Sequence, residues 1–310
     1  MFNEQSDLHI VIDTDPGTDD SLALAIGSVY FKNKISAIIS SYGNVDGVQT
    51  YHNLINLVNL LSINSVLLQG SLNPLNNKDV AYTNYHGNNG LCGIDLPSTK
   101  YVKKNNDAIE SLYNIIRNKI RVKYVSLAPL TNFAKLLEYH PDVVEYIDEL
   151  IIMGGGFHVY NVSNSAEYNF SLDGLAVQNV LKSSVKKILC PLDMTYQLAF
   201  TLEEIESIIG CDREYVFKST SPYSLIAQIF FKNYDTAILH NCSGAIIHDA
   251  TTLMYLLAPD KCRLARKRIK ANDFGSISET ADGYCLDVIQ SIDKNYVASL
   301  LRDVFNQLER

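Results

Sequence analysis

Four aspartates gather in one short segment near the start of the chain. The segment IVIDTDPGTDD, residues 10–20, holds Asp13, Asp15, Asp19 and Asp20 directly after an apolar run. Two like charges about 4 Å apart repel by roughly 4 kcal/mol at an effective dielectric constant near 20. A folded cluster of this kind must therefore protonate or hold a cation. A carboxylate in the first turn of a helix stabilises it by about 0.3–1 kcal/mol through the helix dipole. This role would explain Asp19 and Asp20 but not all four aspartates.

Oxygen ligands without nitrogen or sulfur favour a hard ion, Ca²⁺ or Mg²⁺. Pro16 and Gly17 force a tight turn between the aspartates, and Ca²⁺ accepts the irregular geometry of such a turn more readily than Mg²⁺ does. The spacing does not fit an EF-hand loop, because Gly17 stands at the fifth position, where a ligand is required. We therefore expect a divalent cation at this turn, Ca²⁺ or Mg²⁺, with Ca²⁺ favoured.

Short apolar runs rich in β-branched residues alternate with helix-period segments along the chain. The runs expected as buried strands are residues 8–12, 35–40, 65–69, 123–128, 149–153 and 185–190. This alternation predicts an α/β fold with an open, mostly parallel sheet flanked by helices. Ligands of such sheets bind beyond the carboxyl ends of the strands, which is where the acidic turn follows the first run.

Helical patterns lie between and after these runs. Thr201 and Glu204 form a capping box, and Gly210 marks the end of the same helix. Further helical faces are predicted at Leu54, Leu57, Val58 and Leu61, at Phe133, Leu136 and Leu137, and at Val297, Leu300, Leu301, Val304 and Leu308. Residues 263–292 are expected to add strands whose pairing the sequence leaves open.

We expect a single domain over residues 1–310, with insertions near 71–106 and 212–247. The net charge of −8 gives no basic field for nucleic acid or an anionic membrane. No apolar run approaches the 18 or so residues of a membrane span, and MFNEQSDLHI lacks the features of a signal peptide. Six cysteines without a CxxC pair predict free thiols. A cytoplasmic protein that acts on a small molecule is the expectation.

The acidic segment DTDPGTDD resembles the N-terminal signature D-x-D-P-G-x-D-D of the nucleoside hydrolases, the inosine-uridine preferring N-ribohydrolase family. The resemblance continues, in chain order, through SSYGNVD, YHGNNGL, LAPLTNFA, IIMGGG, NVSNSAEYNF and IIHDA. It implies an open α/β sheet with the active site at the strand ends. The implied activity is Ca²⁺-dependent hydrolysis of ribonucleosides to free base and ribose for nucleoside salvage, by a homodimer or homotetramer.

The resemblance also implies a role for individual residues. Asp15, Asp20 and Asp249 would bind Ca²⁺ through their carboxylates, together with the main-chain carbonyl of Leu127. Asp19 would be the base that activates water. For Asp249 an alternative role, compatible with metal binding, is the N-cap of a helix over TTLMYLLA.

His248 is the family's candidate acid for a departing purine, a task that suits a side chain titrating near neutrality. His86 is implied as a contact to the base or to the 5′ end of the nucleoside. Tyr234 and His240 could close over the base, although nothing in their spacing selects them.

The remaining implied residues would hold the substrate, and the ribose clamp among them consists of Asn44, Asn161, Glu167 and Asn169. Glu167 and Asn169 are two positions apart, so in an extended segment both would face one side. Met153 is implied as a further substrate contact. It precedes Gly154, which begins a glycine run that no Walker lysine follows, so close backbone approach is favoured over a phosphate loop.

Two segments depart from the family pattern: Ala250 replaces a common proline, and residues 173–176 read DGLA where DPEA is common. Neither removes an implied ligand. The chain has no tryptophan, unlike the purine-specific members that sandwich the base between indoles, but its 19 tyrosines could stack instead. Base preference stays open between pyrimidine, purine and modified nucleosides.

Two other functions compete with this interpretation. Phosphatases of the haloacid dehalogenase type carry D-x-D-x-[TV] after a first strand, but Gly17 stands where they need threonine. A nucleoside-binding protein that has lost turnover would keep the fold, and loss of Asp19 or of a metal ligand would have indicated it. All of those residues are present.

Overall fold

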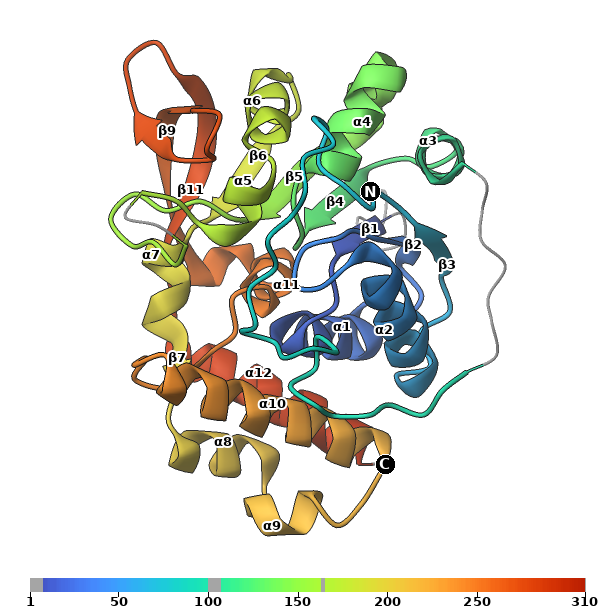
Figure 1. Cartoon of the computed structure of the whole chain (residues 1–310), viewed down its shortest axis with the longest axis vertical. Helices are drawn as coiled ribbons and strands as arrows, with labels where there is room; N and C mark the ends of the chain where they lie inside the picture. The colour runs from blue at the N-terminus through green and yellow to red at the C-terminus, as the bar shows by residue number, and fades with distance from the viewer. Residues whose placement is uncertain (1–7, 100–106, 163–164, 310) are drawn as a thin grey trace.

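The computed structural model describes residues 8–99, 107–162 and 165–309. The expectations for the first seven residues, for the end of the 71–106 segment and for positions 163–164 of the NVSNSAEYNF motif lie outside these ranges. Within them the chain forms a nine-stranded sheet with helices on both faces, and a separate pair of short strands (Figure 1).

Seven neighbouring strands of the large sheet run parallel, in the order β11-β6-β5-β4-β1-β2-β3. Two antiparallel strands, β9 and β10, extend the sheet beyond β11. The strands are β1 (His9–Thr14), β2 (Ile35–Ser40), β3 (Val66–Gln69), β4 (Val122–Ser126), β5 (Ile147–Met153), β6 (Lys187–Cys190), β9 (Cys262–Ala271), β10 (Ile277–Glu279) and β11 (Tyr284–Ile292). The predicted open, mostly parallel sheet is confirmed.

The central strands read as unbroken apolar runs because both faces of the sheet are covered. One hydrophobic core lies under α1 (Thr18–Tyr30), α2 (Gly47–Leu60), α8 (Leu202–Ile209), α10 (Pro222–Leu239), α11 (Ala250–Leu257) and α12 (Lys294–Leu308). A second core lies on the other face under α3 (Ala108–Arg117), α4 (Thr131–Tyr139) and α6 (Gly174–Lys182). Figure 1 shows the two groups of helices on opposite sides of the sheet.

Shorter elements connect these layers. They are α5 (Tyr168–Leu172), α7 (Leu192–Thr195), α9 (Arg213–Val216), the 3₁₀ turns η1 (Pro141–Glu145), η2 (Tyr196–Leu198) and η3 (Pro259–Lys261), and the strand pair β7 (Ala199–Phe200) and β8 (Ala245–Ile246). No helix in the described part of the chain is both long and apolar enough to cross a bilayer.

All six predicted strands are present, each within two residues of its predicted limits. The capping box of α8 is confirmed: the Glu204 N–H donates to the Thr201 hydroxyl at 3.3 Å, and the Thr201 N–H donates to the Glu204 carboxylate at 2.9 Å. Gly210 ends this helix with φ +90°. The strands expected within residues 263–292 are β9, β10 and β11, and all six cysteines are free.

Candidate active site

The four N-terminal aspartates separate into two environments. The carboxylate of Asp13 accepts hydrogen bonds from Asn132 Nδ2 and from the Tyr124 hydroxyl, both at 2.9 Å. Burial raises the pKa of Asp13 to about 7, although these two donors oppose the shift. Asp13 therefore ties β1 to β4 and α4 and is not part of the acidic cluster.

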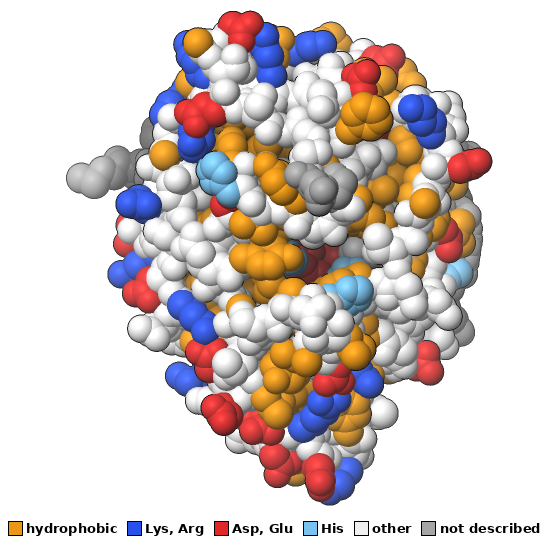
Figure 2. Space-filling view, turned by 60° about the vertical axis from the view of Figure 1, so that its left-hand side comes forward, with side chains coloured by type: hydrophobic (Ala, Val, Ile, Leu, Met, Phe, Trp, Pro, Cys, Tyr) orange, Lys and Arg blue, Asp and Glu red, His pale blue; other side chains and the backbone are white. Residues whose placement is uncertain are grey.

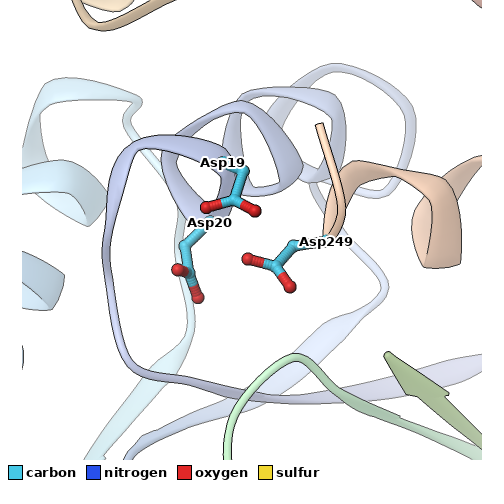
Figure 3. A group of neighbouring side chains, drawn as sticks. All are labelled: Asp19, Asp20 and Asp249. Carbon is cyan, nitrogen blue, oxygen red and sulfur yellow. The ribbon is translucent and has the colours of Figure 1, made fainter. Parts of the chain in front are cut away.

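Asp19, Asp20 and Asp249 form the acidic cluster, and one carboxylate oxygen from each lies within 4.8 Å of the others. In Figure 3, Asp19 and Asp20 extend from the start of α1 toward Asp249, which stands where α11 begins. All three are buried. Burial, with the charge of Asp19, raises the pKa of both Asp20 and Asp249, and burial raises that of Asp19 to about 6. Close carboxylates of this kind fit a hard divalent cation.

A buried carboxylate oxygen without a hydrogen-bond partner also supports the binding of a cation here. Asp19 Oδ1 is buried and has no hydrogen-bond partner among the described residues, which is costly unless another ligand satisfies it. Asp249 stands at the N-cap position of α11, but its side chain caps no backbone N–H. The N-cap hydrogen bond is therefore not observed, and the Asp249 carboxylate lies instead against those of Asp19 and Asp20.

The acidic turn is held in shape by hydrogen bonds. Asp20 accepts from the Thr14 hydroxyl at 2.5 Å and from the Gly17 N–H at 2.9 Å. Asn44 donates from Nδ2 to Asp20 at 3.0 Å and from its backbone N–H to Asp15 at 2.7 Å. A Cβ atom at Gly17 would stand 2.6 Å from Asn44 Nδ2, so only glycine permits this approach. Asn44 thus clamps the turn.

The loop after β5 supplies the opposite wall. Glu167 accepts from the backbone N–H groups of Gly155 at 3.0 Å, Asn169 at 2.8 Å and Phe170 at 2.9 Å. It is the N-cap of α5, so the expectation of an extended segment at Glu167 and Asn169 is wrong. The Glu167 carboxylate accepts hydrogen bonds from N–H groups at the start of α5, and this stabilises the beginning of the helix.

Asn169 contacts two other residues proposed from the sequence. Its Nδ2 donates to the Leu127 carbonyl at 2.7 Å and lies 3.6 Å from Met153 Sδ. The Leu127 carbonyl therefore already accepts one hydrogen bond and keeps its second lone pair for another ligand. Asn161 accepts from the Tyr168 N–H at 2.9 Å, which fixes its side chain beside Glu167.

These side chains enclose a small cavity of about 50 Å³. Every site residue proposed from the sequence lines it except Asp20, and Tyr168 is added. Asp20 stands behind the wall, where its oxygens accept the hydrogen bonds described above. Residues that are distant in the sequence therefore lie together around one cavity.

A larger cavity of about 790 Å³ adjoins the first and shares Asn44, His86, Asn161, Tyr168 and His248 with it. Figure 2 shows the hollow, with acidic and histidine side chains at its floor and hydrophobic side chains around it. Its aromatic lining consists of four tyrosines and three histidines: Tyr85, Tyr160, Tyr168, Tyr196, His86, His240 and His248.

Two aromatic pairs border this larger cavity. The rings of Tyr85 and His240 lie 4.9 Å apart, and those of Tyr196 and His248 lie 5.5 Å apart. Tyr234 and His240 are the two residues considered from the sequence as able to close over the base. His240 lies in the cavity wall, whereas Tyr234 packs against the core under α1. The cavity offers flat rings on which a heterocyclic base could stack.

His86 is fixed in one tautomer. The backbone N–H of Thr18 donates to His86 Nδ1 at 3.2 Å, so Nδ1 carries no proton. Burial lowers the pKa of His86 to about 4, which makes the ring neutral at pH 7. The proton of the neutral ring is then on Nε2, which lies 4.0 Å from Asp19 Oδ1.

His248 is also neutral. Burial, reinforced by His86, lowers its pKa to about 3, so the expected titration near neutrality is not found. Its Nδ1 lies 2.7 Å from the Thr195 hydroxyl. A neutral imidazole can still stabilise developing negative charge by donating a hydrogen bond.

Three residues at or beside the cavities are not among those proposed from the sequence: Tyr168, Thr195 and Tyr196. Tyr168 stands between two proposed residues of the NVSNSAEYNF motif, so adjacency was the available signal. Thr195 and Tyr196 follow β6 at its carboxyl end, the position at which ligands of parallel sheets bind. The signal for these two residues is therefore their place after the end of a strand.

A buried acidic cluster at the carboxyl edge of a parallel sheet, opening into an aromatic cavity, defines a small-molecule enzyme of the α/β class. The family model of the inosine-uridine preferring nucleoside hydrolases matches residues 10–296. The chain belongs to this family. It is a nucleoside hydrolase, a glycosidase that acts on N-glycosyl compounds.

Similar proteins agree with this assignment. The pyrimidine-specific ribonucleoside hydrolase RihA of Escherichia coli O8 is 28% identical over 96% of this chain and 97% of its own length. RihA of Photobacterium profundum is 31% identical over 81% of this chain and 80% of its own. The purine-preferring ribonucleoside hydrolase of Gardnerella vaginalis superposes with a TM-score of 0.87 at 18% identity, over 97% of this chain and 98% of that one. This structural likeness shows the shared fold.

Proposed function

We propose that this chain hydrolyses the N-glycosidic bond of ribonucleosides to free base and ribose, with Ca²⁺ as cofactor, in nucleoside salvage. The observation that carries the proposal is the acid-lined cavity of about 50 Å³ beneath an aromatic cavity of about 790 Å³. Together they match a polar sugar attached to a flat base.

The sugar end provides the groups that glycoside hydrolysis needs. The reaction gives the ribose oxocarbenium character and requires a water with a base and a donor for the leaving group. We propose Asp19 as the base, because it lines the cavity and its Oδ1 has no hydrogen-bond partner in the described residues. Glu167 and Asn169, at the same wall, would bind ribose hydroxyls.

The residues proposed to hold Ca²⁺ are Asp15, Asp20, Asp249 and the Leu127 carbonyl. The proximity of Asp19 to Asp20 and Asp249 supports a cation at this place and adds Asp19 as a neighbour of the ligands. When bound, the cation supplies positive charge that keeps these carboxylates ionised at pH 7 and makes nearby water more acidic.

At the base end, His248 and His86 both line the larger cavity, as do the tyrosines. We propose that neutral His248 donates an N–H to the departing base and that His86 contacts the base or the 5′ end. Tyrosine rings would stack on the base in place of the indoles that this chain lacks.

We further propose a single domain over residues 1–310, since β11 and α12 complete the sheet and core that β1 begins. A cytoplasmic location is proposed because all six cysteines are free thiols. A homodimer or homotetramer is proposed from the family resemblance.

Released base measured over a panel of ribonucleosides tests the proposed function. The panel contains uridine, cytidine, inosine, adenosine, guanosine and modified nucleosides, because the similar proteins include pyrimidine-specific and purine-preferring enzymes. We expect base and ribose in equal amounts from at least one of them. Tight binding without release of base would identify a binding protein, and phosphate release from sugar phosphates would identify a phosphatase.

Replacing His248 with alanine is expected to lower kcat more for inosine than for uridine. A purine that leaves with its bonding electrons needs a donor at the ring, and removal of such a donor costs about 10²–10⁴-fold in rate. The measurement is kcat on both substrates for wild type and His248→Ala, with the unfolding temperature as control. Equal losses on the two substrates would assign His248 a structural role.

A further inference from the structure

Thr195 contacts the proposed leaving-group donor from outside the cavity. It is the last residue of α7, which begins two residues after β6 ends. Its side chain is fully buried, and its hydroxyl oxygen lies 2.7 Å from His248 Nδ1. The other contact of this hydroxyl, to the Leu192 carbonyl, is longer at 3.4 Å.

This contact determines which ring nitrogen of His248 is available to a substrate. Because Nδ1 is engaged by Thr195, Nε2 is the ring nitrogen left for a ligand. His248 lines both cavities, and the Tyr196 ring packs 5.5 Å from the imidazole. The ring is therefore held at one edge by a hydroxyl and beside one face by an aromatic side chain.

The turn that carries Thr195 is itself fixed. The Asp193 carboxylate accepts from the backbone N–H groups of Phe157 at 2.7 Å and His158 at 2.8 Å. The Leu192 N–H donates to the Gly155 carbonyl at 2.9 Å. These bonds attach α7 to the loop after β5, so the position of the Thr195 hydroxyl is set by the same backbone that carries the ribose-binding wall.

We propose that Thr195 is a positioning residue whose hydroxyl holds the His248 imidazole with Nε2 toward the departing base. The inference rests on the proposed function in one respect, the action of His248 at the leaving group. Thr195 does not contact the substrate, and it acts through the orientation of the ring. A displaced ring would bind substrate but stabilise the leaving base poorly, so kcat changes more than KM.

Thr195→Val removes the hydroxyl at nearly constant shape, and Thr195→Ser keeps it. Both are assayed on the best natural ribonucleoside and on 4-nitrophenyl β-D-ribofuranoside, whose leaving group is a stable anion that needs no donor. For Thr195→Val we expect a loss of kcat on the nucleoside about tenfold greater than the loss on the nitrophenyl riboside. Thr195→Ser is expected to restore most of the nucleoside activity. Equal losses on the two substrates would overturn the proposal.

A second measurement separates positioning from a structural effect. In a His248→Ala background, Thr195→Val is expected to cause no further loss of nucleoside kcat, because the ring that it positions is absent. A further loss of the same size as in wild type would contradict the proposal. Thr195→Ala serves as a second variant in the same cycle if Thr195→Val does not fold. Wild-type release of base is measured first, so a failure of the proposed function is recognised independently of Thr195.

Discussion

Asp19→Asn is expected to lower kcat by at least about 100-fold while the fold and the metal site are preserved. Asparagine has the shape of aspartate but cannot accept a proton, so it removes the proposed base and little else. Asp19 is suited to this task because it lines the cavity and its buried Oδ1 has no hydrogen-bond partner in the described residues. Steady-state kinetics on the preferred nucleoside, with Ca²⁺ affinity measured alongside, provides the test.

Asp15→Asn is the matched comparison for this variant. Asp15 lines the same cavity, but its carboxylate already accepts the Asn44 N–H at 2.7 Å, and it is a proposed metal ligand. We therefore expect Asp15→Asn to weaken Ca²⁺ binding as well as turnover, whereas Asp19→Asn lowers turnover alone. Near-normal turnover in Asp19→Asn would remove Asp19 from the mechanism. A loss of turnover at unchanged Ca²⁺ affinity in Asp15→Asn would assign the base to Asp15.

Removal of the metal is expected to have the largest effect, a fall of activity to the uncatalysed background. Without a cation the ionised carboxylates of Asp19, Asp20 and Asp249 repel one another, and burial favours their protonated forms. The positive charge that would make nearby water more acidic is lost as well, so the proposed base would face a poorer proton donor. The measurement is turnover after dialysis against a calcium chelator, followed by addition of Ca²⁺ or Mg²⁺.

Addition of Ca²⁺ is expected to restore activity and to raise the unfolding temperature. A ligand present at 100 times its Kd stabilises the folded state by about 2.7 kcal/mol. Mg²⁺ is expected to restore less, because it demands a more regular shell of ligands than this turn offers. Full turnover in thoroughly metal-free protein would contradict a metal role in the reaction.

The strands of the parallel sheet could be predicted because each is buried on both faces and reads as a short apolar run. β2 coincides with its predicted limits, residues 35–40. Helix α10 gave no such pattern. Its residues Leu225, Ile226, Ile229 and Phe230 are all buried, together with most of their neighbours, and a helix that is enclosed on several sides lacks a single apolar stripe.

The candidate site was predictable where its residues are neighbours in the sequence or match family motifs. The separate role of Asp13 could not be predicted, because its partners Tyr124 and Asn132 lie more than 100 residues away in the sequence. Only the folded sheet brings them close to Asp13. The contact of Thr195 with His248 spans 53 positions and was hidden for the same reason. The cap at Glu167 differs from these two, since it is local and depends on the helix that begins at the next residue.

Calorimetric titration of Ca²⁺ into the metal-free chain tests most directly whether the acidic cluster holds a dication. We expect one site per chain, lost in Asp249→Asn, whose carboxylate comes from the far end of the sequence to meet Asp19 and Asp20. Binding in the wild type should tighten when ribose is present, since the sugar is proposed to bind beside the ion. Absence of Ca²⁺ binding in the wild type, or unchanged binding in Asp249→Asn, would contradict the proposed centre.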